Sequence, residues 1–195
     1  MLSKLFNKEY PEFWKKYTDS FKNPATKYVV LSMETSGLDT DKDVIMSIAA
    51  TSVIDNRIIL KDSFEIFIQH KKHTEIDIDN EFISVSKIEK VFENEAIETL
   101  LNYLNNSILI GHRIDFDIEM LNKALSRLKL GKIRNEAFNI EDMFNKIMKT
   151  NEKKYSLEEM SKALKINLSE RNSVADDTYS IALLFLKMKD KLGIK

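Results

Sequence analysis

Glu34 stands at the end of an expected strand and directly before a turn, where its carboxylate could do chemistry. The run Tyr28–Leu31 is apolar and partly β-branched, which predicts a strand, and Ser36-Gly37 is a turn signal that ends it. Side chains alternate faces along a strand, so Ser32 and Glu34 project to the same side. A carboxylate in such a place is a common ligand for a hard divalent cation.

Two further acids stand at the starts of expected helices. Asp117 falls in the first turn of a helix that follows a short buried strand at 107–111, where the helix dipole favours an acid. Asp176 stands three residues after Ser173, and this pair is typical of a helix N-cap. Each acid has this local structural interpretation, and each is also a candidate metal ligand.

The elements that must position these acids follow a clear order. Three strands are predicted at 27–33, about 43–55 and about 57–69, with Asp55-Asn56 as a hairpin turn between the last two. The stretch 70–90 is polar and predicts no element. From about 93 the apolar pattern changes to a helical period, and short strands at 107–111 and near 137–140 alternate with helices. Ser156 and Glu159 form a capping box before a further helix, and the final helix spans about 174–190.

This order predicts an α/β fold. Three antiparallel strands followed by β-α alternation give a mixed β-sheet flanked by helices on both faces, a ribonuclease-H-like arrangement. We divide the chain into an N-terminal helical extension at 1–26 and a main domain at 27–195. Pro11 opens a short amphipathic helix in the extension. Its aromatic residues either pack on the main domain or bind a protein partner.

Composition bounds the class of protein. The chain has 195 residues, 31% of them charged and 43% hydrophobic, which fits one soluble globular domain. It has no cysteine, so disulfides and thiolate metal sites are excluded. The net charge of −1 argues against a wholly basic nucleic-acid binder but allows a local basic groove. We see no signal peptide or membrane span, and we expect a cytoplasmic protein with no membrane partner.

Three motifs in order resemble the DEDDh family of 3′–5′ exonucleases, which includes the epsilon subunit of DNA polymerase III and RNase T-like proteins. Residues 32–37, Ser-Met-Glu-Thr-Ser-Gly, resemble the first motif, Asp-x-Glu-Thr-Thr-Gly. Residues 111–117, Gly-His-Arg-Ile-Asp-Phe-Asp, resemble Gly-His-Asn-x-x-Phe-Asp. Residues 171–176, Arg-Asn-Ser-Val-Ala-Asp, align with His-x-Ala-x-x-Asp. Tyr155-Ser156-Leu157 also matches a segment that is common in the family.

The resemblance implies a metal-dependent hydrolase that removes nucleotides from the 3′ ends of single-stranded DNA or RNA. Its carboxylates would hold Mg²⁺ or Mn²⁺, with two ions about 3.5–4 Å apart at the scissile phosphate. The implied catalytic and metal-binding residues are Glu34, Asp117 and Asp176. The implied substrate-binding residues are Thr35, Gly37, Leu38, Arg113 and Phe116, and His112 is expected to be a hydrogen-bonded structural residue.

The chain departs from the family at two catalytic positions. Ser32 stands in place of the Asp that bridges both ions, and Arg171 in place of the general-base His. A neutral hydroxyl is a poor bridge, and a guanidinium cannot be deprotonated near neutral pH. We therefore expect weak or absent Mg²⁺ binding and impaired catalysis.

The sequence leaves two placements open for the Arg171 side chain and three functions open for the chain. Arg171 either pairs with the remaining carboxylates in an internal salt-bridge cluster or points to solvent. The chain is a weakened exonuclease, a catalytically inactive scaffold or protein-interaction module, or an active exonuclease rescued by Asp115 or Asp177. Basic residues near the expected groove could contact a phosphate backbone, or they could simply form a solvated surface. They are Arg113, Lys129, Lys132, Arg134, Lys153 and Lys154.

Overall fold

A six-stranded mixed sheet forms the centre of the computed structural model, which describes residues 9–70, 89–168 and 173–194. The strands lie in the order β4-β3-β2-β1-β5-β6. β1 (Tyr28–Thr35), β2 (Ile45–Ile54) and β3 (Arg57–Gln69) are antiparallel, as the sequence predicts. β5 (Ile108–Gly111) pairs parallel with β1, and β6 (Ala137–Asn139) with β5. This confirms the mixed sheet.

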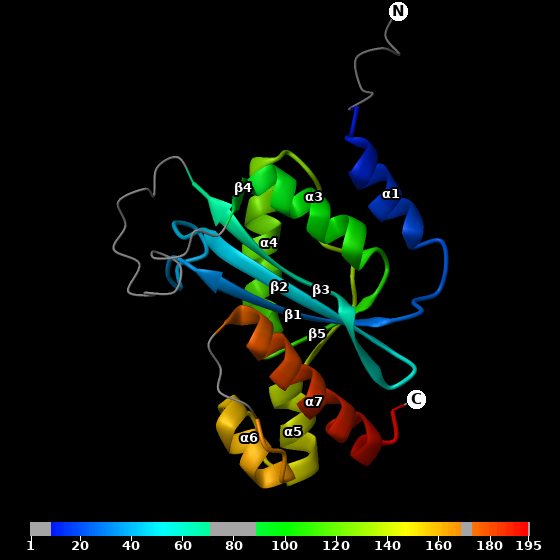
Figure 1. Ribbon diagram of the computed structural model, residues 1–195, viewed down its shortest axis with the longest axis vertical. Helices are drawn as coiled ribbons and strands as arrows, with labels where there is room; N and C mark the ends of the chain where they lie inside the picture. The colour runs from blue at the N-terminus through cyan, green and yellow to red at the C-terminus, as the bar shows by residue number, and fades with distance from the viewer. Residues whose placement is uncertain (1–8, 71–88, 169–172, 195) are drawn as a thin grey trace, which may run out of the picture.

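Helices cover both faces of the sheet (Figure 1). α1 (Glu12–Ser20), α3 (Glu93–Leu104) and α4 (Ile114–Arg127) supply the core on one face. α5 (Ile140–Met148), α6 (Leu157–Leu164) and α7 (Val174–Leu192) supply the second core on the other face. The α/β, ribonuclease-H-like prediction is therefore confirmed. No helix among the described residues has the length and apolar character needed to cross a membrane.

The turns and helix caps predicted from the sequence are present at several ends of strands and helices. Asp55 and Asn56 both have positive φ, 50° and 58°, which is the backbone of a tight primed hairpin turn. Ser156 forms the predicted capping box with Glu159, and the Ser173 side chain accepts from the N–H of Asp176 at the start of α7. One strand, β4 (Lys90–Phe92), was not predicted from the sequence.

β1 ends two residues later than expected, and this affects the site. The strand runs through Thr35, so Glu34 lies within it rather than after it. The extension is held by a pair of hydrogen bonds between Ser36 and Val44: the N–H of Ser36 donates to the Val44 carbonyl at 2.9 Å, and the N–H of Val44 donates to Ser36 Oγ at 3.1 Å. Backbone pairing thus continues past the point where the apolar pattern stops.

The aromatic residues of α1 pack on the sheet domain. Trp14 and Tyr17 are 5% and 1% exposed and belong to the same core as α3 and α4. The Tyr17 hydroxyl donates to Asn135 Oδ1 at 2.7 Å and accepts from the N–H of Arg134 at 2.8 Å. Burial raises the pKa of Tyr17 to about 12. These two rings are therefore covered by the protein's own core and unavailable to a partner.

Tyr17→Phe is expected to destabilise the protein by about 1–3 kcal/mol, because it leaves the buried acceptor of Asn135 and the N–H of Arg134 without their partner. Chemical denaturation monitored by circular dichroism measures this change. Tyr179→Phe, at a side chain 37% exposed, is the matched control and should shift stability by less than about 0.5 kcal/mol. Equal stabilities of the Tyr17 variant and the natural protein would contradict the anchoring role of α1.

A carboxylate cluster as candidate active site

Ser32 and Glu34 lie on the face of β1 that looks toward α7. Val30, two residues earlier, packs in the α5–α7 core, whereas Leu31 and Met33 pack in the opposite core. Ser32 pairs with Ala49 and Glu34 with Ser47 on β2. The shared face predicted from strand alternation is confirmed. Ser47 is fully buried, and its Oγ has no hydrogen-bond partner among the described residues.

Asp117 comes to Glu34 from the first turn of α4. Its side chain is 7% exposed, and burial raises its pKa well above the usual value, with the charge of Glu34 adding to the shift. Glu34 is half-buried, and its pKa is also raised, first by burial and then by the charge of Asp177. Two segments that are 83 residues apart thus place two carboxylates close enough to oppose each other's ionisation.

The third acid near Glu34 is Asp177, the residue after the one expected. The charge of Asp177 acts on Glu34, whereas that of Asp176 acts on Glu65 of β3. Asp176 also takes part in the local cap, because Ser173 Oγ donates to its Oδ2 at 2.9 Å. The cap predicted from Ser173 and Asp176 is therefore confirmed, and Asp177 is the acid of α7 whose charge acts on Glu34.

Glu65 belongs to the same cluster and holds the start of α7. Its Oε1 accepts from the N–H of Val174 at 3.2 Å, and the N–H of Ala175 also donates to this carboxylate. Glu65 lies opposite Ala49, the strand partner of Ser32. Burial raises its pKa, while the two backbone donors lower it. Glu65 thus fixes the helix turn that carries Asp177.

The turn after β1 presents the expected substrate-binding residues at the edge of the cluster. Thr35 Oγ1 donates to the Gly37 carbonyl at 2.7 Å. A Cβ at Gly37 would lie 2.5 Å from an oxygen of the Asp43 side chain, so a larger residue here would require that carboxylate to shift. Leu38, the next residue, is 85% exposed. The turn that follows Glu34 in the sequence therefore holds an apolar side chain out in solvent.

The start of α4 contains the other residues of the second motif. His112 donates from Nε2 to the Tyr155 carbonyl at 2.9 Å, and burial lowers its pKa. The expectation of a hydrogen-bonded structural histidine is confirmed. Phe116 is partly buried against the α1–α3–α4 core, whereas Arg113 is exposed and caps α4 with a positive φ of 60°. Asp115 is exposed on the same turn.

The described carboxylates do not form a two-metal centre. Within residues 9–70, 89–168 and 173–194, no group of three or more His, Cys, Asp or Glu side chains has an arrangement that could hold a metal ion. Glu34, Asp117 and Asp177 offer the hard oxygen ligands that Mg²⁺ prefers, but Ser32 contributes only a neutral hydroxyl. Arg171 and the salt-bridge cluster expected around it lie outside the described residues.

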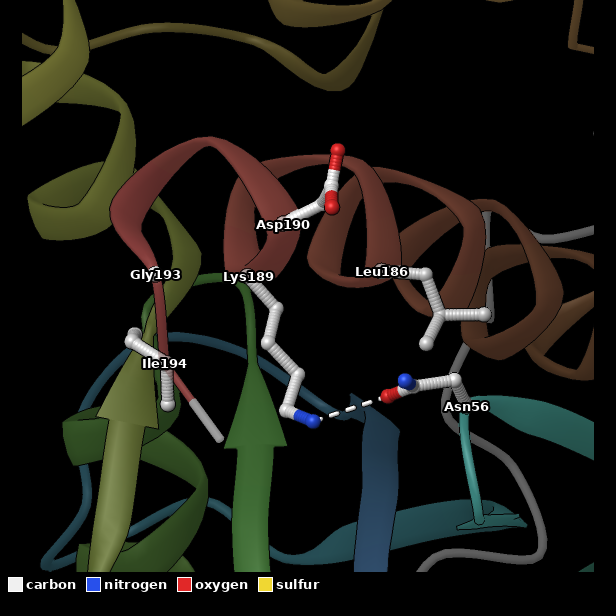
Figure 2. A pocket seen from close by; sticks show the side chains of 6 residues that line it. All are labelled: Asn56, Leu186, Lys189, Asp190, Gly193 and Ile194. Carbon is white, nitrogen blue, oxygen red and sulfur yellow. Dashed lines mark hydrogen bonds between the residues drawn. The ribbon is translucent and has the colours of Figure 1, made fainter.

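Other features of the molecule lie away from this cluster. A cavity of about 360 Å³ lies at the far end of α7, between the helix C-terminus and the β2–β3 turn (Figure 2). Lys189 points across it and donates to Asn56 Oδ1 at 2.8 Å, so the pair ties α7 to the hairpin. Arg134, one of the expected basic groove residues, lies instead beside Tyr17 at the α1 junction.

The sequence of α7 contains a signal that distinguishes Asp177 from Asp176. Val174, Thr178 and Ile181 mark the buried stripe of α7, and Asp177 lies on that stripe, three residues after the first and four before the last. Asp176 is displaced by one residue, about 100° around the helix. Glu65 and Glu141 were also missed. Glu141 stands beside Ile140 on the apolar side of α5, whereas no pattern distinguishes Glu65 from other strand acids.

Known proteins share this fold. The family model described as Exonuclease (RNase T) matches residues 29–185. The chain is 29% identical over 179 residues to a DNA polymerase III PolC-type protein of Staphylococcus haemolyticus, covering 91% of this chain and 12% of that protein. It is 26% identical over 172 residues to the 3′-5′ exonuclease DinG of the same organism, covering 85% and 18%. The chain thus spans less than a fifth of either relative.

Solved structures of exonucleases share the fold. Exonuclease I superposes with a TM-score of 0.71 at 13% identity, over 85% of this chain and 41% of that one. Exonuclease X in complex with 5′ overhanging duplex DNA gives a TM-score of 0.59 at 17% identity, over 86% and 94%. Because the family model covers most of the chain and the three motifs resemble the same group, this chain belongs to the RNase T exonuclease family, with the DEDDh arrangement of motifs.

Proposed function

We propose that this chain is a 3′–5′ exonuclease-family domain that binds single-stranded nucleic-acid ends and hydrolyses them poorly. The observation that supports this is the neighbourhood of Glu34. The charge of Asp177 acts on Glu34 and the charge of Glu34 acts on Asp117, while the residue two places earlier on the same strand face is Ser32. In this proposal the binding surface is kept, whereas the carboxylate expected to bridge two ions is replaced by Ser32.

The residues have separate roles in this proposal. Leu38, exposed on a rigid turn, packs against a terminal base, and Thr35 and Gly37 hold that turn. Arg113 contacts the phosphate backbone, and Phe116 supports the first turn of α4 from the core. Glu34, Asp117 and Asp177 are the carboxylates at the scissile phosphate, with Asp177 in the place first assigned to Asp176. Divalent ions, on which exonucleases of this family depend, bind here weakly at most.

If Asp177 is the acid of the third motif, the position of the missing general-base His also changes. In the family motif the His precedes the Asp by five residues, and counting back from Asp177 gives Asn172 rather than Arg171. An amide, like a guanidinium, does not accept the proton of an attacking water at neutral pH. Whether the motif ends at Asp176 or at Asp177, the position of the general base holds no residue that can act as one. The general base is worth about 10²–10⁴ in rate.

A nuclease assay on a 3′-labelled single-stranded oligonucleotide with Mg²⁺ or Mn²⁺ tests the proposal. We expect binding of the oligonucleotide and cleavage near background. Robust degradation that Asp177→Ala abolishes would instead support the rescued, active exonuclease. Absence of both binding and cleavage would support the scaffold or protein-interaction alternative.

A further inference from the structure

Glu141 is a buried carboxylate that the candidate active site does not use. It lies on α5 and is 1% exposed. Its Oε1 accepts from the N–H of Tyr155 at 2.8 Å, while its Oε2 is buried with no hydrogen-bond partner among the described residues. A buried charge with an unfilled acceptor site requires compensation by nearby cations.

Two cations from different loops converge on this unfilled oxygen. Arg113 Nε lies 3.8 Å and Lys154 Nζ 3.7 Å from Oε2. Both distances exceed the 2.7–2.9 Å or so of a charge-assisted hydrogen bond, so neither cation is fully engaged. Their side chains are 60% and 75% exposed. Glu141 therefore holds two cations at one place on the surface while their donors remain open to solvent.

The backbone fixes this convergence. Arg113 adopts a left-handed conformation at the N-cap of α4, which a non-glycine residue rarely adopts, and its N–H donates to Asn139 Oδ1 at 3.1 Å. On the other side, the hydrogen bonds of Tyr155 to Glu141 and His112 hold the segment that carries Lys154. These hydrogen bonds hold the two segments that carry Arg113 and Lys154 on either side of Glu141.

The charges around Glu141 favour the binding of an anion. One carboxylate faces two cations at the positive end of the α4 dipole. The neighbouring acids explain why two cations are needed. Glu34, Asp117 and Asp177 form an acidic cluster that would repel a polyanion. Asp117 lies only one helical turn beyond Arg113. Cations beside that cluster offset the repulsion.

We infer that Arg113 and Lys154, held over Glu141, form a binding site for a backbone phosphate of single-stranded nucleic acid. The inference rests on the proposed function, since the phosphate belongs to the strand whose end reaches Glu34 and Asp117. Glu141 is a positioning residue: it offsets the mutual repulsion of the two cations and touches no substrate. The site recognises the charge of the nucleic-acid backbone and not the base sequence, because both contacts go to phosphate.

The salt dependence of binding tests this site. Fluorescence anisotropy with a labelled oligothymidylate, in EDTA so that no cleavage occurs, gives the dissociation constant at several salt concentrations. Each phosphate contact on a single strand contributes about 0.7 to the slope of log K against log salt. Because the two cations share one phosphate, Arg113→Gln with Lys154→Gln is expected to reduce this slope by about 0.7, whereas Lys154→Arg, which keeps the charge, retains it.

Lys15→Gln with Lys16→Gln, two exposed residues of α1, is the matched control for loss of charge and should leave the slope unchanged. Circular dichroism verifies that every variant is folded. An unchanged slope in the Arg113 and Lys154 double variant, or an equal reduction in the control, would overturn the phosphate site while leaving the proposed function standing. No binding by the natural protein would overturn both.

Discussion

Asp117→Asn is expected to stabilise the protein at pH 7, by an amount on the order of 1 kcal/mol, because one unit of raised pKa corresponds to about 1.4 kcal/mol. Asp117 is nearly fully buried beside Glu34, and its pKa in the folded state is raised well above the usual value. Asn keeps the size of the side chain and removes the charge. A substitution within the candidate active site should therefore raise the unfolding temperature.

The sign of the pH dependence follows from the same shift. Below the unfolded pKa of about 3.9, Asp117 is protonated in both states and the variant gains little. Above that pH the unfolded chain releases its proton first, so the natural protein loses stability until the pH passes the raised folded pKa. The advantage of Asp117→Asn should therefore grow from pH 4 upward and then level off.

Thermal unfolding of both proteins between pH 4 and pH 8 measures this difference. Asp115→Asn is the matched control, since Asp115 lies exposed in the same helical turn. It should be neutral or slightly destabilising, because it removes only a favourable interaction with the helix dipole. A lower unfolding temperature for Asp117→Asn at pH 7 would contradict the burial of an uncompensated carboxylate pair.

Ser32→Asp combined with Asn172→His is expected to raise exonuclease activity by about 10² or more over the natural chain. The two changes restore the bridging carboxylate and the base, which act on the same transition state. Each change alone should recover little, because the effects of groups that work together are not additive. Initial rates on a single-stranded oligonucleotide with Mn²⁺ measure the gain.

A second pair of substitutions distinguishes the two alignments of the third motif, one ending at Asp176 and the other at Asp177. Ser32→Asp with Arg171→His restores the base expected from Asp176, whereas the Asn172 pair restores the base expected from Asp177. We expect activity from the Asn172 pair alone, lost again on Asp177→Ala and kept on Asp176→Ala. The opposite result would return the role to Asp176 and Arg171.

The sheet and its helices could be predicted because their signals are local. The Asp55-Asn56 turn, the Ser156 capping box and the Ser173 cap depend on residues within a few positions of one another, and all three are present. The choice between Asp176 and Asp177 depends instead on which side of α7 faces β1. Only the packing of the whole helix determines that rotation, although the buried stripe gives a hint of it.

Contacts across the sheet explain the remaining misses. Glu65 receives backbone donors from residues 109 positions away, so nothing near it in the sequence indicates its role. Glu141 resembles an ordinary first-turn acid, and its importance arises from Tyr155, Arg113 and Lys154, which come from other segments. Such interactions are properties of the folded chain, and short sequence patterns do not encode them.

The two-ended attachment of α7 has a consequence for synthesis of the chain. The helix is tied to Glu65 at its start and to Asn56 at its end, by hydrogen bonds between residues 109 and 133 positions apart in the sequence. Neither tie can form until α7 has left the ribosome. The acidic surface around Glu34 and Asp117 therefore acquires Asp177 only after translation of residues 174–192, and a nascent chain that stops before them presents an incomplete site.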